Sequence, residues 1–514
     1  MPLTDTTKII EHGIVATGDR HNRVGHFAIL IRNDRIIDIV PHAEPLKHQF
    51  PNAEVIDAKG KVLLPGFIDA HYHGESFLLR HIVGTTPMAR WEKDRHYRTA
   101  YAYLNDEASR EDLESLYRIA YFNALKAGIT CLADFGLDNL NHHPMSCFEA
   151  MKRAELKGFI GLHNGDQLEK CRSLQSTNIR FGVTISNEDD LTTYTLQTAL
   201  RSADELKFPL MVHLGETRRA LETLKKNFHR TTSQLLNEYH LFNMKMQLSH
   251  ASVLEGEDAD VLAASKIPVI VSPTSAVLKE VEIPPVGEFL SRGIPIALGT
   301  DWGVPDPLTS IRTLVSIVRT QGRSIPGPLE LLAMCTRNGA QALGFLDVLG
   351  TIEPGKKADI TFVDVADTRL GLFVKNHHYL QILNSIFFEG SSRDISDVMI
   401  NGNFYVREGT VLTYSEEDLL MEGDRLLSKL SPQPLQKELP SRIEEERRSA
   451  PVLSFETSQV IEDAEEPSEE GFRIMKKEAG SGGAERGITP ANPATAKPVD
   501  VSKNVRKVFG EDDL

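Results

Sequence analysis

The residues best suited to chemistry are two histidines one residue apart, His71 and His73, at the end of a short apolar run. In a strand, side chains two residues apart point to the same face. Both imidazoles can therefore aim at one point beyond the end of a strand, where a single cation could sit. A His-x-His pair alone is a weak signal, so the prediction depends on ligand-type residues at the ends of other strands.

Further residues of this kind follow three other apolar runs. His213 lies in FPLMVHLGE, His250 in MQLSHAS and Asp301 in IPIALGTD. Three imidazoles and one carboxylate, with room for a water molecule, suit a catalytic Zn²⁺ or Fe²⁺ site better than a Ca²⁺ or Mg²⁺ site. Such a cation lowers the pKa of its bound water to about 7, so hydroxide becomes available at neutral pH.

Glu216 is the candidate for proton transfer, because it lies three residues after His213 in HLGE. In this interpretation Asp301 takes a proton from the water while Glu216 delivers one to the substrate, as a paired acid and base. The alternative is structural: Glu216 would be a carboxylate at the start of a helix, where the helix dipole favours negative charge.

The elements that must position these residues are eight short apolar runs that alternate with amphipathic segments. Such strands, apolar along their length and separated by helices, predict a parallel sheet covered on both faces. Eight of them favour a (β/α)8 TIM-like barrel over residues 63–349, with reactive residues at the carboxyl ends of the strands. A doubly wound sheet is the alternative, although no glycine fingerprint follows the first run. Pro65 is expected at the first residue of the first strand, since it has no N–H for a central ladder. The runs are VLLPGFIDAHYH, GITCLADFG, GFIGLHNGD, IRFGVTIS, FPLMVHLGE, MQLSHAS, IPVIVSPTS and IPIALGTD.

The two ends of the chain share a sequence pattern that differs from that of the barrel. Residues 1–62 and 350–415 consist of short apolar runs separated by turn residues, which predicts a small β-sandwich domain assembled from both termini. Residues 416–431 could form one terminal helix. Residues 432–514 are an acidic, low-complexity tail that cannot bury enough apolar surface to repay the entropy of ordering, so we expect disorder there. Whether the tail binds a partner is open.

Composition limits the partners and the compartment. The 514 residues carry a net charge of -15, which argues against a general nucleic-acid binder. No apolar run approaches the roughly 20 residues of a membrane helix, and the first residues lack the order of a signal peptide. The four cysteines have no CxxC spacing, which indicates thiols that stay reduced in a reducing compartment. We therefore expect a cytoplasmic enzyme with a small-molecule substrate, no nucleic-acid or membrane partner, and a homo-oligomeric state, a dimer or higher.

The motifs PGFIDAHYH, HLGET, LSHAS, PTS and LGTD, in that order, resemble the amidohydrolase superfamily. Within it they resemble the branch that holds atrazine/triazine hydrolases, guanine and cytosine deaminases and adenosylhomocysteine-type deaminases. The similarity spans residues 7 to about 412, and LGTIEPGKKADITFVD resembles the family's return into the split sandwich. Two-metal members usually carry a lysine at the end of the fourth strand. IRFGVTIS ends without one, so the resemblance favours a mononuclear site.

The resemblance also implies roles for the strand-end residues. It assigns His250 to the substrate or the attacking water, and Glu216 to proton transfer. It implies one metal ion held by His71, His73, His213 and Asp301.

The pocket wall departs from the family pattern. Where many deaminases have a histidine motif after the fourth strand, this chain has Ile185-Ser186-Asn187-Glu188. The usual asparagine after PTS is Ala276, and the usual glycine after the last aspartate is Trp302.

Three other residues have two interpretations each. His163 and Asp166, after the third run, could line the pocket or only form loop hydrogen bonds. Trp91, in a segment similar to the family's covering loop, could stack on a flat ring or pack in the core.

We therefore expect a metal-dependent hydrolase of carbon–nitrogen bonds that deaminates a nitrogen heterocycle of purine, pyrimidine or triazine type by metal-hydroxide attack. Its cofactor would be one divalent transition metal, Zn²⁺ before Fe²⁺, and its catalytic residues Glu216, His250 and Asp301. A neighbouring hypothesis uses the same site to open a cyclic amide or displace a halide. A rival from another class is a non-catalytic barrel that only binds a ligand.

Overall fold

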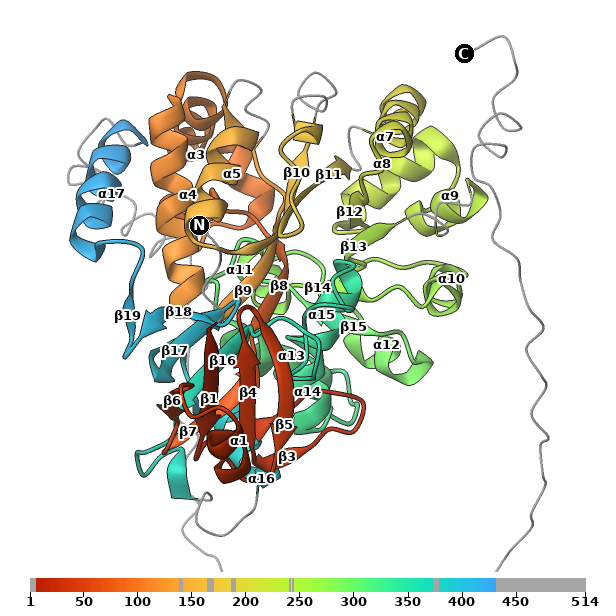
Figure 1. Cartoon of the computed structure of the whole chain (residues 1–514). Helices are drawn as coiled ribbons and strands as arrows, with labels where there is room; N and C mark the ends of the chain where they lie inside the picture. Colours follow the sequence, from red (N-terminus) through yellow and green to blue (C-terminus); the bar gives the residue numbers. More distant parts are fainter. Residues whose placement is uncertain are drawn as a thin grey trace, which may run out of the picture. The chain divides into compact units, whose positions relative to one another are not determined.

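The computed structural model describes residues 6–137, 142–163, 171–185, 191–239, 242, 245–372 and 379–430. Its largest feature is an eight-stranded parallel sheet in which neighbours in sequence are neighbours in the sheet (Figure 1). A parallel bridge between Tyr72 and Asp301 joins the last strand to the first, and the Asp301 N–H donates to the His71 carbonyl at 2.8 Å. The sheet closes into a barrel, which confirms the predicted fold and excludes the doubly wound sheet. The strands are β8 (Phe67–Tyr72), β9 (Ile129–Asp134), β10 (Lys157–Leu162), β11 (Ile179–Ile185), β12 (Leu210–Leu214), β13 (Met246–His250), β14 (Val269–Val271) and β15 (Ile296–Leu298).

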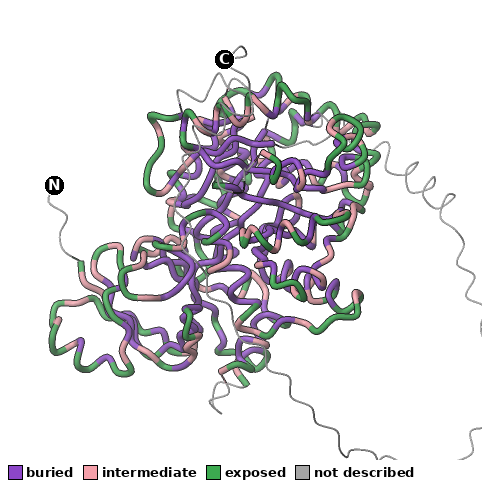
Figure 2. The backbone as a smooth tube through the Cα atoms, turned by 90° about the vertical axis from the view of Figure 1, so that its right-hand side faces the viewer, coloured by how far each residue is buried: buried purple, intermediate pink, exposed green. Residues whose placement is uncertain are grey.

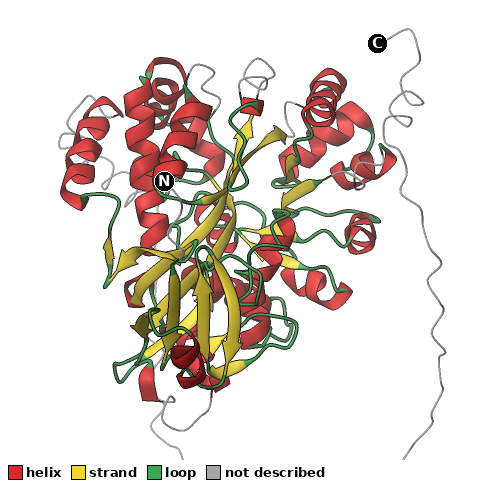
Figure 3. Ribbon diagram, in the orientation of Figure 1, coloured by secondary structure: helices red, strands yellow, loops and turns green. Residues whose placement is uncertain are grey.

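Helices surround this barrel, as Figure 3 shows. The barrel strands are buried almost throughout, and Figure 2 shows the buried backbone gathered in the interior of the fold. In such a barrel, helices cover the outer faces of the strands and side chains fill the interior. The helix predicted before the second strand begins after Ser109, whose hydroxyl caps the N–H of Asp112. The helices between barrel strands and after the last one include α4 (Arg110–Lys126), α5 (His143–Arg153), α7 (Thr193–Leu206), α8 (Arg218–Phe228), α9 (Thr232–Glu238), α10 (Asp258–Ser265), α11 (Pro273–Lys279), α12 (Val286–Arg292) and α13 (Pro307–Thr320).

The run that carries the first two histidines is divided between two strands. Pro65 is the last residue of a sandwich strand, β7 (Lys61–Pro65), and not the first residue of the barrel strand, so that expectation was wrong. Gly66 separates the two strands. A Cβ atom there would lie 2.3 Å from the Thr130 hydroxyl oxygen, so this junction accepts only glycine.

The sandwich combines both ends of the chain, as predicted. Strand β16 pairs antiparallel with β7, with Ile360 opposite Pro65 and Asp364 opposite Lys61. One sheet has the order β19-β18-β17-β16-β7-β2-β3 and the other the order β5-β4-β1-β6. Their apolar faces share one buried cluster that includes Ile10, Leu63 and Phe362. The remaining strands are β1 (Thr7–Glu11), β2 (Ile14–Ala16), β3 (Val24–His26), β4 (Ala28–Arg32), β5 (Arg35–Val40), β6 (Glu54–Asp57), β16 (Ile360–Asp364), β17 (Ile395–Ile400), β18 (Asn403–Arg407) and β19 (Thr410–Val411).

The sandwich joins the barrel at the amino ends of its strands. Lys157, the first residue of β10, is buried and forms an ion pair with Asp359 at 2.7 Å. The Asp359 carbonyl also accepts from the Gly66 N–H at 2.9 Å. This arrangement leaves the carboxyl ends of the barrel strands, where the predicted site residues lie, free of the sandwich.

The final described helix, α17 (Glu416–Leu430), packs on α4. Lys429 contacts Asp112 at 2.7 Å, and Arg118 contacts Glu422 at 2.8 Å. The predicted disordered tail, 432–514, lies outside the described residues. Within the described ranges, no helix has both the length and the apolar content needed to cross a membrane. The other helices are α1 (Glu44–Gln49), α2 (Ser76–Val83), α3 (Arg95–Ala102), α14 (Pro328–Met334), α15 (Arg337–Ala342) and α16 (Tyr379–Glu389).

Candidate metal centre and active site

The five strand-end residues predicted from sequence meet at the carboxyl end of the barrel. All five are buried, and their ligand atoms form two overlapping groups within which every pair of atoms lies within 4.8 Å. His71 belongs to both groups. It comes from β8, which His73 directly follows. The groups are His71, His73 and His213, and His71, His250 and Asp301.

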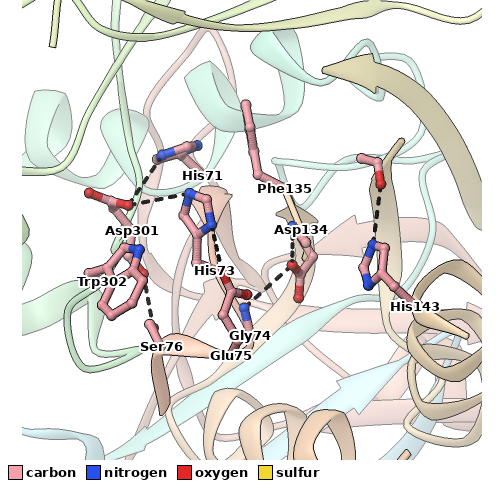
Figure 4. A network of polar contacts seen from close by, with 12 residues as sticks. His71, His73, Gly74, Glu75, Ser76, Asp134, Phe135, His143, Asp301 and Trp302 are labelled. Atoms are coloured by element: carbon pink, nitrogen blue, oxygen red, sulfur yellow. Dashed lines mark hydrogen bonds and ion pairs between the residues drawn. The ribbon is translucent and has the colours of Figure 1, made fainter. Parts of the chain in front are cut away.

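The distances show a common point of convergence (Figure 4). Asp301 Oδ1 lies 3.5 Å from His71 Nε2 and 3.6 Å from His73 Nε2. His73 Nε2 lies 3.4 Å from His213 Nε2. The ring of His250 stacks on that of His213, with centroids 5.0 Å apart. Three ring nitrogens and one carboxylate oxygen thus face the same small volume.

Several of these buried atoms lack a hydrogen-bond partner. Among the described residues, both ring nitrogens of His71, Nδ1 of His213, Nε2 of His250 and Oδ1 of Asp301 are buried and make no hydrogen bond. Such atoms are normally paired, because an unpaired buried polar group costs about 1–3 kcal/mol. One divalent metal ion fits this donor set, since imidazole nitrogen and carboxylate oxygen are the ligands of catalytic transition metals.

Burial keeps most of the histidines in the neutral form that binds metals. It lowers the pKa of His71 to about 3, and it also lowers the pKa values of His213 and His250. His73 is different. Burial opposes its charge, but the Glu75 carboxylate, 3.0 Å from its Nδ1, and then Asp301 outweigh burial and raise its pKa to about 9.

Glu75 and Asp134 form a second layer behind His73 that the sequence reasoning missed (Figure 4). Asp134 accepts from the Gly74 N–H at 3.4 Å and from the Tyr121 hydroxyl at 2.8 Å. A carboxylate that accepts from Nδ1 fixes the ring so that Nε2 faces the metal. The available signal was the place of Asp134 at the end of strand β9.

The loop that carries Asp301 is also fixed from behind. Asp69 Oδ1 accepts from the Thr300 N–H at 2.9 Å, and its Oδ2 accepts from the Thr300 hydroxyl at 2.5 Å. Asp301 and His250 have φ values of 50° and 73°, in the left-handed region that residues other than glycine seldom adopt. Backbone conformations of this kind concentrate at functional sites.

Glu216 lies at the same end of the barrel, beside a residue that the sequence reasoning missed. Lys279, the last residue of α11, approaches Glu216 Oε1 at 2.5 Å and Asp301 Oδ2 at 2.6 Å. Burial would raise the pKa values of both carboxyls, but the Lys279 ammonium lowers them below their ordinary values. Both carboxyls are therefore ionised at neutral pH. The signal in the sequence was a lysine in a short segment directly after a barrel strand.

Aromatic side chains line one flank of the histidine cluster. The ring centroid of Trp302 lies 6.4 Å from that of His73 and 4.6 Å from that of Trp91. Tyr97 completes the group at 5.4 Å from Trp91. The Trp91 indole N–H donates to the Thr86 carbonyl at 2.7 Å, which fixes the ring. Trp91 is thus both packed and close to the site, and Trp302 stands between it and His73.

The remaining sequence candidates contribute less. His163 bonds through Nε2 to the Phe135 carbonyl at 2.8 Å, and the Phe135 ring packs edge-on against His71 at 4.2 Å between centroids. Asp166 and the segment 186–188 lie outside the described residues. Ala276 is buried in α11, close in sequence to Lys279.

Comparison with known proteins is consistent with this geometry. Residues 62–405 match the model of the amidohydrolase family. The 5-methylthioadenosine/S-adenosylhomocysteine deaminase of Moorella thermoacetica is 27% identical over 427 residues, which cover 79% of this chain and 96% of that protein. The enzyme of the same name from Pyrococcus furiosus is 25% identical over 440 residues, covering 80% and 98%.

Solved structures share the fold. An adenosine deaminase from Xanthomonas campestris with bound zinc has a TM-score of 0.73 at 19% identity, covering 83% of this chain and 98% of that one. The zinc-complexed atrazine chlorohydrolase of Arthrobacter aurescens TC1 has a TM-score of 0.68 at 18% identity, covering 82% and 100%. The guanine deaminase of E. coli reaches 0.67 at 20% identity, covering 78% and 99%.

Proposed function

This chain belongs to the amidohydrolase family and is a hydrolase of carbon–nitrogen bonds, and we propose that it deaminates a nitrogen heterocycle of purine, pyrimidine or triazine type. The observation that carries the proposal is the convergence of unpaired imidazole nitrogens and one carboxylate oxygen beside Glu216. In this proposal one divalent metal, Zn²⁺ before Fe²⁺, is held by His71, His73, His213 and Asp301.

When bound, the metal supplies a water molecule whose pKa is lowered to about 7. The side chains of this chain provide the proton movements. Asp301 takes one proton from the attacking water. Glu216, which is ionised before the reaction, accepts the water's other proton and then delivers it to the ring nitrogen or to the leaving ammonia. His250 Nε2, buried without a hydrogen-bond partner among the described residues, is left to contact the substrate at the carbon that is attacked.

The aromatic flank supports a flat substrate. Trp302 and Trp91 present indole rings next to His73, and rings prefer offset or edge-to-face contact with other rings. A heterocycle placed there would bring its amine-bearing carbon towards the metal. Because both of these relatives are named for 5-methylthioadenosine and S-adenosylhomocysteine, amine-bearing purine nucleosides are the first substrates to test.

A second candidate uses the same residues to open a cyclic amide or to displace a halide. The structural likeness to an atrazine chlorohydrolase favours retaining it. A binding barrel without catalysis is disfavoured. Glu216 belongs to neither group of candidate metal ligands, yet its carboxylate lies in the same site, where proton transfer would need it.

The test is a panel assay on protein whose metal content has been measured. Ammonia release is followed with 5-methylthioadenosine, S-adenosylhomocysteine, adenosine, guanine, cytosine and an aminotriazine. Chloride release from a chlorotriazine and acid formation from a cyclic amide are followed in parallel. Ammonia release that is lost in Asp301→Ala supports the proposal. Metal-loaded protein that releases only chloride or acid favours the second candidate, and inactivity on the whole panel contradicts both.

A further inference from the structure

Lys279 occupies an uncommon place for a lysine, because its side chain is only 5% exposed and lies between two carboxylates. Its ammonium contacts Glu216 Oε1 at 2.5 Å and Asp301 Oδ2 at 2.6 Å. Burying a charged group is costly unless it is paired and hydrogen-bonded. Two carboxylates in one buried site would also repel each other. The three charged groups therefore stabilise one another as a set.

The two oxygens of Asp301 have separate partners. Oδ1 faces the ring nitrogens of His71 and His73, at 3.5 and 3.6 Å. Oδ2 accepts from Lys279 and, at 2.8 Å, from the Ser275 hydroxyl. The ammonium therefore does not take the place of a metal at Oδ1. It shares Oδ2 with the Ser275 hydroxyl, and this hydroxyl still holds the carboxylate with Oδ1 towards the histidines when the ammonium is absent.

Lys279 is fixed by its own element. It is the last residue of α11, a helix that begins at Pro273 directly after strand β14 and also supplies Ser275. The two residues lie one helical turn apart and both reach Asp301, so they share one face of the helix. The helix thus presents two donors to one carboxylate, and the ammonium extends further to Glu216.

We propose that Lys279 is a positioning residue, whose ammonium ties Glu216 to Asp301 and so holds the proton-carrying carboxylate beside the metal ligands. This inference rests on the proposed function only for the role of Glu216. Since Lys279 donates to Oε1 of Glu216, the other carboxylate oxygen, Oε2, carries the transferred proton. Loss of the ammonium frees the rotation of Glu216, which slows the chemical step more than it weakens substrate binding.

The first test compares Lys279→Met with Lys279→Arg and with a matched control, Lys157→Met. Lys157 also forms a buried ion pair with an aspartate, but at the amino end of the barrel. We expect Lys279→Met to keep its metal, measured by elemental analysis and chelator competition. Its kcat should fall about 10²-fold, as for a misplacement on the order of 1 Å, with a much smaller change in KM. Lys279→Arg should recover part of the loss, and Lys157→Met should lower Tm while kcat stays near normal.

The second test asks whether Lys279 acts through Glu216. In the Glu216→Gln background, adding Lys279→Met should reduce kcat little further, because the two residues act as a unit. If Lys279→Met lowers kcat in the Glu216→Gln background by the same factor as in the wild-type protein, the proposal is overturned. Unchanged kcat in Lys279→Met, or loss of the metal in it, overturns it as well.

A crystallographic test separates this inference from the proposed function. In metal-loaded Lys279→Met, the Glu216 carboxylate should leave its place beside Asp301, since two like charges then face each other. If it stays in place, the positioning role is wrong. If it moves while the wild-type protein releases no ammonia from any heterocycle, the positioning role stands and the proposed deamination fails.

Discussion

The Glu75 carboxylate lies 3.0 Å from Nδ1 of His73, and this contact turns the opposite nitrogen of the ring towards the other ligand-type residues. The carboxylate comes from the residue before helix α2, only two positions along the chain. A short loop therefore supplies both the proposed ligand and the group that orients it.

Loss of this orienting contact should weaken metal binding without removing a ligand. We expect Glu75→Ala to lower metal affinity about 10- to 100-fold, the effect typical of removing a partner of a metal-binding histidine. Glu75→Gln keeps an acceptor for the Nδ1 N–H of His73, so its metal affinity should fall less than that of Glu75→Ala. Competition with a chelator measures both. Equal affinity in Glu75→Ala and wild type would show that His73 needs no such support.

The ligand set itself predicts metal content. The purified protein should carry about one transition metal per chain, and His71→Ala or Asp301→Ala should remove it, because each deletes a donor from a centre of four. His163→Ala is the control, since that ring bonds to a backbone carbonyl. Elemental analysis decides the outcome. Metal-free protein that is still fully active would contradict the whole scheme.

The ion pair between α17 and α4 predicts a pH-dependent stability. Burial opposes ionisation of Asp112, but Lys429, followed by the Tyr103 and Ser109 hydroxyls, lowers its pKa from 3.8 to about 2. A carboxyl with a lowered folded pKa stabilises the fold above its unfolded pKa, and this stabilisation is lost as pH falls through the folded value. We expect Lys429→Met to lower the free energy of unfolding by about 1–3 kcal/mol at neutral pH.

The difference in the free energy of unfolding between Lys429→Met and the wild-type protein should shrink as the pH falls from 3.8 to about 2. Urea unfolding at a series of pH values measures it. Lys207→Met is the control, because Lys207 pairs with Asp204 while 78% exposed, and exposed pairs contribute little. A difference that does not depend on pH would assign the effect to lost packing.

The barrel and the strand-end residues could be predicted because both are local features of the sequence. Four of the eight apolar runs end on ligand-type residues, and a closed parallel barrel brings those four ends together. The boundary at Pro65 could not be predicted, because the apolar run continues through it without a change of period. The change of pairing partner shows where one strand stops and the next begins, because β7 pairs with β16 up to Pro65 and β8 pairs with β9 from Phe67.

Lys279 and the aromatic flank could not be predicted for a related reason. The direction of Lys279 depends on where a seven-residue helix begins after β14, which the sequence does not determine to one residue. Trp91 and Trp302 come from segments far apart in the chain and meet only when the barrel closes. Their contact has no counterpart in sequence spacing.

The acid–base assignment predicts a loss of turnover without loss of metal. Glu216→Gln keeps the size of the side chain but removes the titrating carboxylate, so turnover should fall about 10²–10⁴-fold while the metal stays. His250→Asn should also keep the metal, with lower turnover and weaker substrate binding. Loss of metal in Glu216→Gln would make the carboxylate a ligand. Near-normal turnover would show that Glu216 takes no part in proton transfer and only precedes helix α8.

The aromatic flank predicts an effect on substrate binding. Trp302→Gly removes the indole that stands between Trp91 and His73, and with it one ring contact to a bound heterocycle. Such contacts contribute about 0.5–1.5 kcal/mol, so KM should rise about 2- to 12-fold. Because the indole takes no part in proton transfer, kcat should change less than KM. The control is Tyr194→Ala, which removes a 77% exposed ring from α7. A fall in kcat at constant KM would show instead that Trp302 orients His73 or keeps water out of the site, and that the substrate ring lies elsewhere.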